Sequence, residues 1–74
     1  MNDSPVGYAV VIEKAGNNYS AYAPDLPGVI TTGRTVEATE RNMRRAIAFH
    51  LRELRAAGEP IPAPTARATY IAAR

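Results

Sequence analysis

Residues 8–23 have the sequence YAVVIEKAGNNYSAYA, and this stretch decides the fold. Its first part, residues 8–13, is rich in branched and aromatic side chains, which favour a strand. Turn residues follow at positions 15–18. Residues 19–23 then alternate ring or methyl side chains with small polar ones until Pro24, which has no amide donor for a sheet. The stretch therefore predicts two strands joined by a hairpin.

A short loop, Pro24-Asp25-Leu26-Pro27-Gly28, follows the hairpin. Its two prolines restrict φ and Gly28 permits a positive φ, so we expect a rigid turn. Leu26 is the large apolar residue of this loop, and we expect it to plug the core beneath it. Residues 29–32, Val-Ile-Thr-Thr, then predict a short third strand.

The second half of the chain begins with a helix signal. Thr35 is a suitable N-cap, because its hydroxyl can accept a hydrogen bond from an unpaired amide of the first turn. Gly58 is expected to stop the helix. Between them an apolar stripe recurs every three or four residues, which predicts an amphipathic helix; it comprises Val36, Thr39, Met43, Ile47, His50 and Leu54, with Ala46 and Leu51 beside it.

Prolines at positions 60, 62 and 64 predict a stiff extended connector, and residues 67–71, Arg-Ala-Thr-Tyr-Ile, predict a last strand. The fold class is therefore α+β, in the order β-β-β-α-β. We expect a three-stranded antiparallel meander, one helix on one sheet face and a final strand parallel to the first. In this arrangement no element of the chain packs against the other sheet face, and an uncovered apolar face usually marks an interface.

The length of 74 residues predicts a single domain over residues 1–74. Because so short a chain builds only a small core, we expect a homo-oligomer, most simply a dimer. Cysteine is absent, which excludes disulfides and thiolate zinc sites and makes the cytoplasm the expected location. The longest apolar run, residues 9–12, is far too short for a membrane span.

Several motifs occur in a specific order along residues 8–64. They are Val10-Val11-Ile12-Glu13-Lys14, Tyr19-Ser20-Ala21-Tyr22, Pro24-Asp25-Leu26-Pro27-Gly28, Gly33-x-Thr35-x-Glu37, Asn42, Ala46-Ile47, His50-Leu51 and Gly58-x-Pro60-Ile61-Pro62-x-Pro64. In this order they resemble the N-terminal domain of HicB-like antitoxins.

The resemblance implies a partial RNase H-like fold and a role in a type II toxin-antitoxin pair. A family member of this kind binds and masks a HicA-like toxin, a small RNA-cleaving protein. Many relatives carry a further DNA-binding segment; since the chain stops at Arg74, we expect no such segment here.

The loop is the expected partner contact, because a loop stiffened by proline loses little entropy on binding. Partner-binding residues are predicted to be Tyr22, Pro24, Asp25, Leu26, Pro27 and Gly28. No catalytic residue, metal ligand or cofactor site is predicted. His50 is the single histidine and lacks partners for a ligand set, so it is expected to pack, and no carboxylate cluster suited to two Mg²⁺ ions is evident on the predicted strands. The chain is not expected to be an enzyme.

The charge pattern supports an alternative function. Nine Lys and Arg residues against seven Asp and Glu residues give a net charge of +2. A row at helical spacing, Arg41, Arg45, Arg52 and Arg55, is able to track a phosphate backbone. Glu37, Glu40 and Glu53 interrupt that charge, which favours a simple solvated face. A stand-alone, weakly basic nucleic-acid-binding or scaffold domain therefore remains the second hypothesis.

Overall fold

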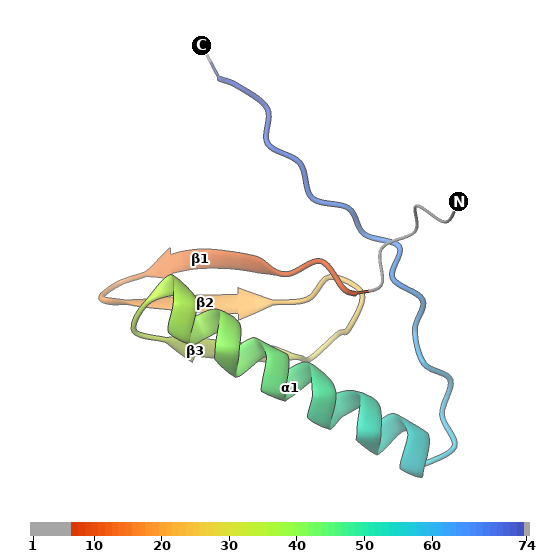
Figure 1. Ribbon diagram of the computed structural model, residues 1–74. Coiled ribbons are helices and arrows are strands. Elements are labelled where there is room, and N and C mark those ends of the chain that lie inside the picture. Colours follow the sequence, from red (N-terminus) through yellow and green to blue (C-terminus); the bar gives the residue numbers. More distant parts are fainter. Residues whose placement is uncertain (1–6, 74) are drawn as a thin grey trace.

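Three strands and one helix follow one another in a computed structural model that describes residues 7–73. The strands β1 (Val11–Ala15), β2 (Asn18–Tyr22) and β3 (Ile30–Gly33) form an antiparallel sheet in the order β1-β2-β3. The helix α1 (Val36–Ala56) lies across one face of that sheet (Figure 1). The predicted meander and its single covering helix are confirmed.

The hairpin between β1 and β2 closes through the two residues Gly16 and Asn17. Gly16 has a φ of 62°, a value that L-residues rarely adopt and that short hairpin loops require. The register pairs Ala15 with Asn18 and Lys14 with Tyr19. The turn chemistry of the sequence therefore aligns the first two strands.

Both predicted ends of the helix are confirmed. The Thr35 hydroxyl accepts a hydrogen bond from the Ala38 amide at 2.9 Å, which satisfies one free donor of the first turn. At the other end Gly58 has a φ of 71°, and its amide bonds back to the Arg55 carbonyl while the Glu59 amide bonds to the Leu54 carbonyl. This pair of bonds is a Schellman motif, for which glycine is the favoured residue.

The core lies between the sheet and α1. Its buried apolar residues are Ala21, Ala23, Leu26, Val29 and Met43. Thr39 is also completely buried, and its hydroxyl donates to the Thr35 carbonyl at 2.7 Å, so the helix can place a polar residue in the core without leaving it unpaired. The predicted apolar stripe of the helix faces this core, except that Val36 at its first turn is 41% exposed.

The connector after α1 returns along the molecule and forms hydrogen bonds with it. The Tyr8 hydroxyl donates to the Pro62 carbonyl, and the carboxylate of Asp25 accepts hydrogen bonds from Thr65 and Ala66. These contacts fix the direction in which the chain continues.

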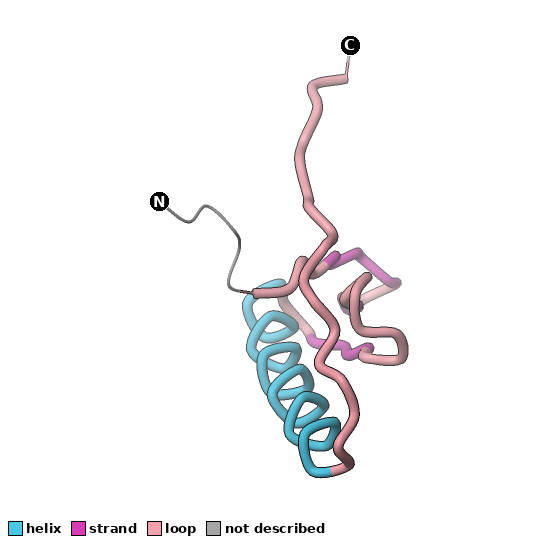
Figure 2. Tube along the Cα trace, turned by 90° about the vertical axis from the view of Figure 1, so that its right-hand side faces the viewer, coloured by secondary structure: helices cyan, strands magenta, loops and turns pink. Residues whose placement is uncertain are grey.

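The predicted last strand is not formed. Residues 67–73 run without strand pairing, and from residue 66 onward the chain leads away from the sheet (Figures 1 and 2). Tyr70 and Ile71 are 100% and 85% exposed. A strand forms only where a partner edge lies within reach, and the hold of Asp25 on residues 65 and 66 directs this tail outward instead of along β1.

Candidate functional site

The sheet face opposite α1 carries a row of apolar side chains. Tyr22 pairs with Val11 on one side and with Ile30 on the other, so the three side chains lie next to one another on the same face. Tyr22 is 43% exposed and Ile30 67% exposed. We call Val11, Tyr22 and Ile30 the cross-strand row.

The next row of this face is polar. Glu13 pairs with Ser20, and Ser20 with Thr32. Among the strand residues of this face Glu13 carries the one charge, because Lys14 alternates to the opposite side, where its Nζ lies 5.8 Å from the centre of the Tyr19 ring. The uncovered face is therefore apolar at one end and weakly acidic beside it.

The loop between β2 and β3 borders the cross-strand row, because it joins Tyr22 to Ile30. Its shape comes from two successive turns, in which the Leu26 amide bonds to the Ala23 carbonyl at 3.0 Å and the Val29 amide bonds to the Leu26 carbonyl at 3.1 Å. Gly28, with a φ of 87°, allows the second turn. Leu26 is 0% exposed and anchors the loop from within.

Asp25 points at the connector. Its Oδ2 accepts from the Thr65 amide at 2.8 Å and the Ala66 amide at 2.9 Å, and its Oδ1 accepts from the Thr65 hydroxyl at 2.7 Å. These bonds, the Ala66 amide first and the Thr65 hydroxyl next, hold the pKa of the Asp25 carboxyl below its ordinary value. The carboxylate thus has an internal structural role.

The six residues predicted to bind a partner divide into three groups in the structure. Tyr22, Pro24, Pro27 and Gly28 are exposed, Asp25 is half-buried and bonded to the connector, and Leu26 is buried. Leu26 therefore supports the surface from below.

Sequence reasoning did not single out Val11 and Ile30. Alternation along a strand puts one of two neighbours such as Val29 and Ile30 inside and the other outside, but only the pairing register shows that Ile30 stands next to Tyr22.

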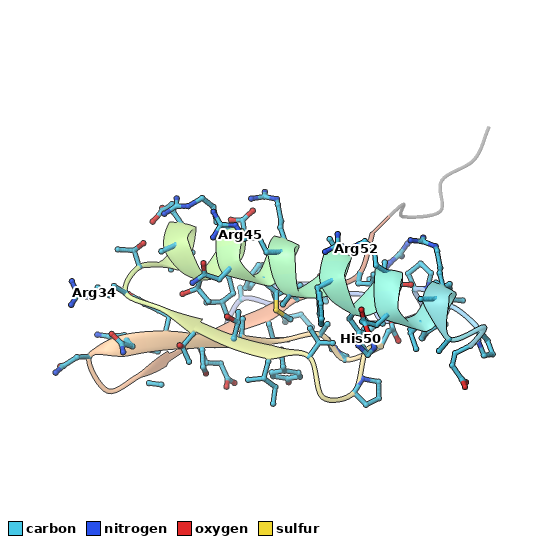
Figure 3. All side chains as sticks on the ribbon, turned by 90° about the horizontal axis from the view of Figure 1, so that it is seen from below. Arg34, Arg45, His50 and Arg52 are labelled. Atoms are coloured by element: carbon cyan, nitrogen blue, oxygen red, sulfur yellow. The ribbon has the colours of Figure 1, made fainter. Side chains whose placement is uncertain are left out.

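Two basic residues of the helix lie on the other side of the molecule. Arg45 and Arg52 point away from the sheet, whereas His50 lies on the side of α1 nearer the strands (Figure 3). Arg52 also lies over the Phe49 ring at 5.9 Å, and Arg44 bonds to Glu40 at 2.7 Å. Arg44, Arg45 and Arg52 are all exposed to solvent.

Within residues 7–73 no group of three or more His, Asp or Glu side chains is close enough to hold a metal ion. The same residues contain no helix with the length and apolar character required to cross a bilayer. His50 is half-buried at the edge of the apolar stripe, as the sequence predicted.

Comparisons with known proteins agree on one family for this chain. The family model described as "HicB_like antitoxin of bacterial toxin-antitoxin system" matches residues 8–74. A 14.9 kDa protein encoded in the rep-hol intergenic region of Haemophilus phage HP1 is 31% identical over 64 residues, which are 86% of this chain and 48% of the relative. A UPF0150 protein of Helicobacter pylori is 41% identical over 46 residues, which are 62% of this chain and 64% of the relative.

A solved structure is also similar. The N-terminal domain of the Burkholderia pseudomallei antitoxin HicB superimposes with a TM-score of 0.71 at 30% identity, covering 78% of this chain and 69% of that one. The chain spans from about half to about two thirds of the length of the relatives that it matches.

Proposed function

Because the chain belongs to the HicB-like antitoxin family of bacterial toxin-antitoxin systems, we propose that it binds a HicA-like, RNA-cleaving toxin and masks the toxin's active surface. The proposed action is occlusion, with no reaction carried out by the antitoxin itself. The site of action is the cytoplasm, where such a toxin meets its RNA. The class of toxin is inferred from the resemblance found in the sequence. The surface proposed to bind it is the sheet face opposite α1.

The observation that carries the proposal is the cross-strand row. Tyr22 and Ile30 stand exposed side by side, and the stiff loop that borders them is pinned by the buried Leu26. A surface that is already ordered loses little entropy when a partner binds. Aromatic side chains at the centre of such a surface commonly carry much of the binding energy.

Charge favours the same face. A protein that cleaves RNA has to attract phosphates, and its active surface is therefore basic. The helix presents Arg45 and Arg52 to solvent, which would repel that surface (Figure 3). The sheet face presents Glu13 beside the apolar row instead. Like charges at an interface cost affinity, so the toxin is assigned to the sheet face.

The test is binding of a purified HicA-like toxin to this chain. In a double variant, Tyr22→Ser with Ile30→Ser, we expect the Kd for the toxin to rise by about tenfold or more, because two central apolar contacts are lost. Both residues are exposed, so the variant is expected to fold. The matched control is Phe49→Ser, which removes a 57% exposed apolar side chain from the helix and is expected to bind as the parent does.

Two results would overturn parts of this proposal. If the folded double variant binds the toxin with unchanged affinity, the cross-strand row is not the toxin-binding surface. Absence of binding by the parent chain, together with tight and salt-sensitive RNA binding, would favour the nucleic-acid-binding alternative.

A further inference from the structure

The tail of the chain has the composition of a strand but lies apart from the body. Residues 67–73 follow the hold of Asp25 on Thr65 and Ala66 and then lead away from the sheet (Figures 1 and 2). Tyr70 is 100% exposed and Ile71 85% exposed. By contrast, Ile61 in the connector is 38% exposed. The two large side chains of the tail, Tyr70 and Ile71, are therefore not packed against their own subunit.

The sheet offers a free edge. In the described part of the chain β1 pairs with β2 along one side, and no strand pairs with the other, outer side of β1. The outer side of β3 is different, because the Asn42 side chain of α1 donates to the Thr32 carbonyl at 2.8 Å. The outer edge of β1 is therefore the edge that we consider for a further strand.

An apolar groove of about 720 Å³ runs beside this free edge, between β1 and α1. Tyr8, Val10 and Ile12 line it from the sheet side. Met43, Ile47 and Leu51 line it from the helix. A strand added to β1 would lay every second side chain over this groove.

We propose that the tail of one subunit adds to the outer edge of β1 in a second copy of the same chain, and that the exchange is reciprocal. Each copy then supplies one donor strand and one acceptor edge, which is the self-complementary arrangement of a closed two-fold dimer. Extended, the seven residues 67–73 span about 23 Å, whereas the five residues of β1 span about 17 Å, so the tail is long enough to cover the edge.

The partner is a second copy because of the hold at Asp25. Three hydrogen bonds to residues 65 and 66 set the exit direction, and the tail then diverges from its own β1 (Figure 1). The small core gives association a further advantage, since a chain of this length buries little apolar surface by itself.

Strand exchange also extends the cross-strand row. Successive side chains of a strand point to opposite faces, so of Tyr70 and Ile71 one enters the groove and the other stands beside Val11. The row would then continue across the subunit boundary. This inference does not depend on the identity of the toxin.

Light scattering on the full chain at tens of micromolar tests the proposal. We expect a dimeric mass for the parent and for the control Phe49→Ser, whose side chain lies outside the groove. The double variant Tyr70→Ser with Ile71→Ser should be monomeric while keeping the helical signal of the parent in circular dichroism, because neither residue belongs to the core. A monomeric parent, or a double variant that remains dimeric, would overturn the proposal.

Disulfide trapping tests whether the tail of one chain lies beside β1 of another. Because the chain has no native cysteine, only the introduced cysteines can form a disulfide. A chain with Val11→Cys is mixed with a longer, tagged chain that carries either Tyr70→Cys or Ile71→Cys. We expect an intermolecular disulfide between the two chains from one of these pairs, at yields far above those with Phe49→Cys. If a single chain carrying both cysteines instead closes an internal disulfide at high dilution, the tail pairs with its own β1 and the exchange is wrong.

Discussion

Asp25 and Thr65 lie 40 residues apart in the chain, yet the carboxylate of one accepts both the amide and the hydroxyl hydrogen bond of the other, at 2.8 and 2.7 Å. The Ala66 amide adds a third bond at 2.9 Å. Through these contacts the loop that borders the cross-strand row also sets the path of the C-terminal tail. One residue of the predicted contact loop therefore links the two surfaces that we assign to partners.

The hold of Asp25 on the tail should depend on pH. Its folded-state pKa lies below the ordinary value of 3.8, so the stabilisation is complete above about pH 4 and is lost as the pH falls through the folded pKa. We expect the amide resonances of Thr65 and Ala66 to shift in a nuclear magnetic resonance titration in this acidic range. Amide shifts that stay constant down to pH 2 would contradict the assignment.

Asp25→Asn should loosen the tail at neutral pH, because the charged acceptor is replaced by a neutral amide with only one acceptor oxygen. We expect faster hydrogen exchange at Thr65 and Ala66 and faster tryptic cleavage after Arg67. The control Glu59→Gln removes an exposed carboxylate from the start of the connector. Equal exchange rates in the two variants would show that the Asp25 bonds contribute little.

Leu26→Ala should destabilise the fold by about 2 to 4 kcal/mol, because it leaves a cavity beneath the loop where a completely buried side chain stood. Urea denaturation followed by circular dichroism measures this change. Ile30→Ala, at a 67% exposed position, is the control and should change stability much less. A midpoint for Leu26→Ala equal to that of the parent would show that Leu26 does not support the loop.

Gly33→Ala should also be destabilising, by about 1 to 3 kcal/mol, although the sequence gives no reason to expect it. A Cβ at Gly33 would stand 2.5 Å from the Thr39 hydroxyl oxygen and 2.6 Å from the Thr39 amide nitrogen, so β3 and α1 would have to separate. Gly7→Ala is a suitable comparison, since nothing lies within 4 Å of its added Cβ. Thermal unfolding should therefore rank Gly33→Ala well below both the parent and Gly7→Ala.

The arginine face separates the two functional hypotheses. Replacing Arg41, Arg45, Arg52 and Arg55 with Gln keeps helix propensity high and removes four positive charges. If the sheet face binds the toxin, the quadruple variant should still rescue growth when it is co-expressed with the toxin. Circular dichroism confirms folding first. A folded variant that no longer protects cells would make the arginine face part of the functional surface.

The sequence by itself determined the local elements. Turn residues at positions 15–18 between two strand-forming runs predicted the hairpin, and Thr35 and Gly58 predicted the two ends of the helix, because these signals act through backbone geometry within a few residues. The ordered motifs were also sufficient for the family. Burial of Leu26 followed from its isolation between two prolines.

Tertiary structure decided which residues meet. The strand register placed Ile30 beside Tyr22 and Val11, and the crossing of β3 with α1 made Gly33 a contact of Thr39. The strand predicted over residues 67–71 was wrong within one subunit, although its composition favours a strand, since pairing depends on where Asp25 directs the chain and not on propensity alone. Register, close approach and chain direction arise between different elements of the fold, and the pattern within one element does not contain them.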